Sequence, residues 1–116
     1  MIDISIGIKL FNDCDFFSAH DFFEDIWMDA ERNEKEFFQG LVQISVGCYH
    51  LICGNKKGAE SQLIKAKTKL IKYQPEYYNI KISNLVIDIE KLLINLNKKN
   101  INNLIPTIKI NQQHQL

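Results

Sequence analysis

Residues 11–19, FNDCDFFSA, and residues 51–59, LICGNKKGA, follow one pattern at a spacing of forty positions. In each stretch an apolar residue is followed by a short turn, by Asp15 or Asn55 as a helix-capping side chain, and by an early alanine. Gly54 supplies the left-handed backbone that ends a helix. A repeat period near forty residues is typical of stacked helical units. Both stretches therefore predict a helix, a tight turn and a second helix.

Apolar residues recur at helical spacing on either side of these turns. We expect helices over 4–11, 16–30, 37–52 and 56–72, ended by Pro75, and a last helix that runs from Asn79 or Ser83 to Asn97. The sequence therefore predicts an all-α, compact bundle of about five helices, arranged as two stacked antiparallel hairpins plus a C-terminal capping helix. The forty-residue echo resembles the tetratricopeptide-type hairpin. A generic helical bundle is the alternative, because tight helical hairpins share these features.

The chain has the size and composition of one folded unit. It holds 116 residues, of which 46% are hydrophobic and 24% are charged, so it can bury a core and does not have the composition of a disordered chain. We expect a single helical domain over residues 1–97. Residues 98–116 are expected to form a docking segment around 101–110, followed by a frayed tail.

Charge and cysteine content restrict the partners. Fourteen Lys and Arg balance fourteen Asp and Glu, which makes nucleic acid and an anionic membrane improbable partners, and the lysines of 56–72 are expected to form a solvated surface. Three cysteines, without C-x-x-C spacing, argue against disulfides and a zinc site. No apolar run is long enough to span a membrane, and residues 1–10 do not have the pattern of a signal peptide. We expect a cytoplasmic protein without a metal or cofactor.

Polar residues that lie beside the apolar stripes are the candidate site. Helical spacing places His20, Glu24 and Trp27 on one face of the second helix, and Gln39, Gln43 and His50 on one face of the third. A histidine and a glutamate four residues apart can bind a metal or transfer protons near neutral pH. The metal interpretation lacks a second ligand pair, and buried polar groups often only satisfy one another. We expect a small cleft beside His20 and Glu24 onto which His50 also opens; the alternative is a structural network.

These residues also resemble a known family. The pattern F-F-x-A-H-D-x-x-E-x-x-W over residues 16–27, F-Q-G-L-x-Q over 38–43, Y-H at 49–50 and G-N-x-x-G-A over 54–59 is similar to the family called domain of unknown function 309. The family pattern usually has Glu where this chain has Asp21, and often a basic residue where it has Met28. The resemblance covers roughly residues 8 to 72. It implies a compact helical fold in which the six candidate residues are signature positions, and it implies no activity.

Two functions follow as hypotheses. The first is an interaction or scaffold module in which helical hairpins present a surface to a protein partner or to a second copy. The second is a small-molecule-binding or hydrolytic acid-base enzyme that uses the His20 and Glu24 cluster between the second and third helices. The sequence does not decide whether the protein is an enzyme.

Overall fold

The computed structural model describes residues 1–98 and 108–113. These residues form five α-helices and a short 3₁₀ helix, with no β-strand among them; the elements are α1 (Ser5–Asn12), α2 (Phe16–Asp29), α3 (Lys35–Ile52), α4 (Lys56–Leu70), η1 (Ile71–Tyr73) and α5 (Ile82–Leu96). Two isolated β-bridges join Tyr77 to Ile80 and Ile80 to Gln112. The predicted all-α bundle is confirmed.

The α1–α2 and α3–α4 turns have the same hydrogen bonds at a spacing of forty residues. The backbone N–H of Asp15 donates to Leu10 at 2.9 Å, and that of Asn55 donates to His50 at 2.8 Å. The Asp15 side chain accepts from the Ser18 N–H at 3.4 Å, as the Asn55 side chain accepts from the Gly58 N–H at 3.0 Å. Both turns pass through the left-handed region, with φ of 64° at Cys14 and 76° at Gly54. The forty-residue echo therefore corresponds to one turn geometry used twice.

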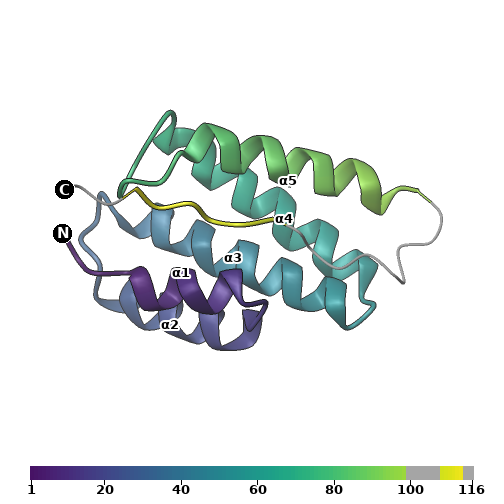
Figure 1. Cartoon of the computed structure of the whole chain (residues 1–116), viewed down its shortest axis with the longest axis horizontal. Coiled ribbons are helices and arrows are strands. Elements are labelled where there is room, and N and C mark those ends of the chain that lie inside the picture. The colour runs from purple at the N-terminus through teal and green to yellow at the C-terminus, as the bar shows by residue number, and fades with distance from the viewer. Residues whose placement is uncertain (99–107, 114–116) are drawn as a thin grey trace.

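Helix α3 lies between α2 and α4 (Figure 1), and the short turn between α3 and α4 makes these two helices antiparallel neighbours. Two glycines allow α4 to approach α3 closely. A Cβ added at Gly40 would lie 2.9 Å from Leu70, and one added at Gly47 would lie 2.9 Å from Leu63. Both leucines are fully buried. This close approach at Gly40 and Gly47 fixes the distance between the two helices.

The segment between α4 and α5 differs from the prediction. Helix α4 ends at Leu70, continues as η1, and is followed by a turn in which Tyr78 and Asn79 both have positive φ. Helix α5 then begins at Ile82, with Lys81 as its N-terminal cap residue, so neither Asn79 nor Ser83 starts it. The physical reason is an aromatic cluster. Within this cluster Tyr78 packs against residues of α3 and so holds the turn in place. The members of the cluster are Phe37, Phe38, Tyr73, Tyr77 and Tyr78.

Residues 108–113 run as a strap along the bundle, between α1 and α5 in the view of Figure 1. Ile108 and Ile110 are buried, and the Asn12 side chain exchanges two hydrogen bonds with the Ile110 backbone, at 2.9 and 2.8 Å. The expected docking segment around 101–110 is described from 108 onward. Its first part, and the expected frayed tail beyond residue 113, lie outside the described residues.

Over 1–98 and 108–113, none of the helices has both the length and the apolar character that crossing a bilayer requires.

Candidate functional site

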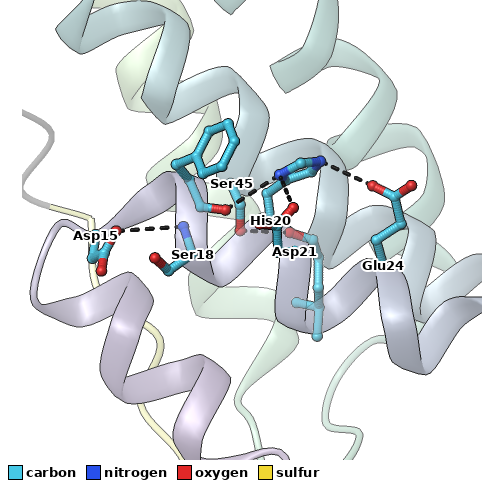
Figure 2. A network of polar contacts seen from close by, with 8 residues as sticks. Asp15, Ser18, His20, Asp21, Glu24 and Ser45 are labelled. Carbon is cyan, nitrogen blue, oxygen red and sulfur yellow. Dashed lines mark hydrogen bonds and ion pairs between the residues drawn. The ribbon is translucent and has the colours of Figure 1, made fainter.

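The site begins with a histidine and a glutamate that lie side by side on α2. His20 Nε2 lies 2.9 Å from Glu24 Oε2, and His20 Nδ1 lies 3.2 Å from both Asp21 Oδ1 and the Phe17 carbonyl oxygen. Figure 2 shows the imidazole held between the two carboxylates. The four-residue spacing on one helix produces the Glu24 contact. Both ring nitrogens of His20 therefore lie close to oxygen atoms.

Trp27 follows Glu24 by one turn and is held from the start of α3. The Lys35 ammonium donates to the carbonyl oxygens of Trp27 at 3.1 Å and Met28 at 3.3 Å, which satisfies two carbonyls at the end of α2. The same ammonium lies 5.2 Å from the centroid of the Trp27 ring, within the range of a cation–π contact. Lys35 therefore fixes the indole at one end of the α2–α3 surface.

The α3 side of the site contains an unsatisfied amide. Gln43 Oε1 is buried and accepts no hydrogen bond from any residue that the structure describes. An acceptor buried without a partner costs about 1 to 3 kcal/mol, and most buried polar atoms in folded proteins are paired. Gln43 is therefore the most unusual polar group in the described part of the chain.

Gln43 borders an open pocket of about 240 Å³ that residues of three helices line. Helix α2 supplies Glu24 and Trp27, and α4 supplies Gln62; the α3 residues are Gln39, Val42 and Gln43. The side chains of Gln39 and Gln62 make no hydrogen bond within the described residues. The pocket thus combines one carboxylate, three amides and an indole, and its amides have donors and acceptors free for a ligand. Its volume is at the small end of ligand pockets and suits one side chain or a small molecule.

The six predicted residues do not all meet in this pocket. Glu24, Trp27, Gln39 and Gln43 line it, and His20 adjoins it through Glu24. His50 does not line it: its Nδ1 lies 3.2 Å from Asn55 Nδ2, and its ring packs where a side chain at Gly58 would clash, at 2.9 Å. The reason is distance, since His50 follows Gln43 by seven residues, or about 10 Å along a helix.

The two histidines are nevertheless linked by a row of ring contacts. Phe17 contacts His20 and Tyr49 with centroid distances of 5.6 Å each, and Tyr49 lies 6.4 Å from the His50 ring. Phe17 is 53% exposed and Tyr49 is 39% exposed. A partly exposed aromatic pair therefore lies on the α2–α3 surface about two helical turns from the pocket.

Sequence reasoning missed three contributors to this surface, namely Lys35, Gln62 and the exposed pair of Phe17 with Tyr49. Lys35 lies between the predicted helices 16–30 and 37–52, and Gln62 lies one position before the inward-facing Leu63. Only the packing of α4 on α3 shows that Gln62 reaches the pocket.

Among residues 1–98 and 108–113, no three His, Cys, Asp or Glu side chains are arranged to hold a metal ion. Cys48 is buried, and burial raises the pKa of its thiol well above the usual range, so this cysteine is a poor nucleophile or ligand.

Comparison with known proteins identifies a family for this chain. A family model described as Domain of unknown function (DUF309) matches residues 4–62, which include α1, α2, α3 and the pocket residue Gln62. No curated protein matches the chain.

Proposed function

The chain belongs to the family described as domain of unknown function 309, whose name assigns no activity, and from that premise we propose that it is a protein-interaction module. Its binding surface is the α2–α3–α4 face, which consists of the pocket at Gln43 and the exposed pair of Phe17 and Tyr49. The observation that carries the proposal is the buried, unpartnered Oε1 of Gln43 at the pocket wall.

The pocket favours a side chain that donates N–H groups. Gln43 Oε1 needs a donor, and the Glu24 carboxylate beside it adds negative charge. A buried acceptor left unpaired in the free protein is explained if a partner supplies its hydrogen bond on binding. An arginine side chain meets these requirements, because its planar guanidinium donates to several acceptors and stacks on aromatic rings.

The exposed aromatic pair supports a protein partner rather than a small molecule. Phe17 and Tyr49 lie about 10 Å along the helices from the pocket. A small molecule in a pocket of this volume would not reach them. Aromatic and arginine contacts dominate the energetics of many protein interfaces, so one partner could contact both places.

The hydrolytic alternative is less well supported. A general base needs a nitrogen or oxygen available to the substrate, whereas both ring nitrogens of His20 lie within 3.2 Å of protein oxygen atoms. His50 is directed to Asn55 and does not line the pocket. The geometry therefore favours binding over acid-base chemistry.

The experiment has a chemical arm and a partner arm. In the first, N-acetyl-arginine amide is titrated while the side-chain amide resonances of Gln39, Gln43 and Gln62 are followed by NMR. We expect these resonances to shift at millimolar probe, and N-acetyl-glutamate amide to leave them unchanged. Gln43→Met should abolish the shift and raise the free energy of unfolding by about 1 kcal/mol, because it removes the unpaired acceptor.

The partner arm uses matched variants for affinity capture. Proteins retained by the wild-type chain should be retained by Gln74→Met, an exposed glutamine outside the pocket, and lost with Gln43→Met and with Phe17→Ala. Unshifted amide resonances together with capture that is identical for all four proteins would exclude this surface as the binding site.

A further inference from the structure

The α2 side of the proposed binding surface is acidic. Residues 13–31 contain seven Asp or Glu and no Lys or Arg. The outward positions of α2 form one exposed stripe, which consists of Phe17, Asp21, Asp25, Met28 and Asp29. Asp25 and Asp29 make no ion pair within the described residues. This stripe is here called the acidic face.

The α4 side carries the opposite charge. Residues 54–74 contain six Lys and one acidic residue, Glu60. The exposed stripe of α4 consists of Lys57, Ser61, Ile64, Lys65 and Thr68, and is here called the basic face. Lys57 and Lys65 have no ion pair among the described residues, whereas Lys67 is paired with Glu90 at 3.6 Å. Ile64 is 47% exposed in the middle of this stripe.

The two faces lie on helices that begin with the same turn geometry. Each helix starts from the same capped turn, at the end of α3 where Phe17 contacts Tyr49 and Gly58 packs on His50. A shift of forty residues places Asp25 on Lys65 and Met28 on Thr68. Asp25 and Lys65 therefore lie at the same level along their parallel helices, on opposite sides of α3.

From this arrangement, which rests on the proposed function of the α2–α3–α4 face, we propose that its partner is a second copy of the chain. Two copies can meet face to face about a two-fold axis in two ways. An axis perpendicular to α3 places α2 on α2, so that acidic faces repel. An axis parallel to α3 places the acidic face of each copy on the basic face of the other, and it brings Asp25 opposite Lys65 twice.

Charge complementarity selects the second arrangement. The whole chain has a formal net charge of zero, so no overall repulsion opposes association. The exposed ring of Phe17 then lies within the interface. The pairs of Asp25 with Lys65 set the orientation of the two copies. In this arrangement the Gln43 pocket of each copy faces the two-fold axis.

The first test is the oligomeric state of the wild-type chain by sedimentation velocity at about 0.01 M and about 1 M salt, where the Debye length is about 30 Å and about 3 Å. We expect a dimer at low salt and weaker association at high salt. A chain that is monomeric at low salt overturns the proposal, as does a dimer whose affinity does not change with salt.

The second test reverses the charge of each face. Asp25→Lys and Lys65→Asp should each weaken self-association on the order of tenfold, because two attractive pairs become repulsive. An equimolar mixture of the two variants should associate again, because each variant then meets opposite charges on the other. The double variant, with Asp25→Lys and Lys65→Asp in one chain, should also dimerise. Lys91→Asp, on the exposed side of α5, makes the same charge change and should have no effect. An equal effect of Lys91→Asp, or no recovery in the mixture, overturns the proposal.

The two proposals can fail separately. If every chain is monomeric while the arginine probe still shifts the Gln43 amide, the second copy is excluded as partner and the interaction surface remains. If Gln43→Met and Phe17→Ala leave probe binding, capture and dimerisation unchanged, this surface has no binding role and the proposed function fails.

Discussion

At the scale of single residues, Tyr78 joins the turn before α5 to the start of α3. Its ring lies 5.4 Å from Phe37 and 5.3 Å from Phe38, measured between centroids, and its hydroxyl donates to Glu34 Oε2 at 3.1 Å. Burial, assisted by the neighbouring Glu34 carboxylate, raises the pKa of Tyr78 to about 12. Both effects disfavour the tyrosinate form in the folded protein.

This raised pKa predicts a loss of stability in alkali. Above about pH 10 the tyrosine of the unfolded chain releases its proton, while Tyr78 in the folded protein keeps it. The free energy of unfolding therefore falls as the pH rises above this value. Below about pH 10 the full stability is retained. Between about pH 9 and about pH 11, the free energy of unfolding measured with urea should fall by on the order of 1 kcal/mol more in wild type than in Tyr78→Phe. Some loss persists in the variant, because the pKa values of Tyr73 and Tyr77 are also raised by burial. Identical pH profiles for the two proteins would contradict the assignment.

Residue positions within one helix are more predictable than contacts between helices. Spacing alone places Glu24 beside His20, and the structure has this contact. The spacing of residues does not predict that Gln62 reaches the Gln43 pocket from α4, or that His50 contacts Asn55 instead. Both contacts depend on how the helices and the turn between them pack. The unpaired Gln43 oxygen is visible only in the folded chain, since burial is a property of the packed structure.

At the scale of elements, the repeated turn shows two solutions to one backbone requirement. Gly54 reaches φ of 76° without a side chain, whereas Cys14 adopts 64° with one. The left-handed conformation costs a residue with a Cβ roughly 1 to 2 kcal/mol. The first hairpin carries this cost at Cys14 and the second avoids it.

Gly54→Ala is therefore expected to lower the free energy of unfolding by about 1 kcal/mol. No atom lies within 4 Å of an added Cβ at this position, so the whole loss comes from the backbone. The free energy of unfolding should fall less in Gly54→Asn, because asparagine tolerates the left-handed region. Urea denaturation of the three proteins measures the difference, and equal losses for alanine and asparagine would point to a steric cause instead.

Helix periods predicted the elements because each helix buries one continuous stripe. About five helices were predicted, and residues 1–98 and 108–113 contain five α-helices. The misplaced start of α5 has a different origin: the residues from 74 to 81 are held by the aromatic cluster and by a bridge between Tyr77 and Ile80, not by a local capping signal. Long-range packing of this kind has no periodic signature.

At the scale of the whole molecule, the strap of residues 108–113 connects parts that are distant in sequence. Asn12 at the end of α1 binds the Ile110 backbone with two hydrogen bonds, and its own carbonyl accepts from Lys109 Nζ at 2.5 Å. Further along, the Gln113 N–H donates to the Asn79 carbonyl at 2.8 Å. The strap thus links the first hairpin to the turn before α5.

Because these contacts lie on one short segment, we expect them to be lost as a unit. Asn12→Ala removes two hydrogen bonds and should cost about 2 kcal/mol, and Ile110→Ala, at a side chain 1% exposed, should cost about 3 kcal/mol. Once either substitution releases the strap, the other has fewer contacts left to remove. The free energy of unfolding of the double variant should therefore fall by at least about 1 kcal/mol less than the sum of the two single losses. Asn97→Ala, which removes a bond within the end of α5 at 3.3 Å, serves as the control and should add to Ile110→Ala within about 0.5 kcal/mol. Full additivity of Asn12→Ala and Ile110→Ala in chemical denaturation would show that the two contacts act independently, and the strap could then not be the cooperative link between the first hairpin and the last turn.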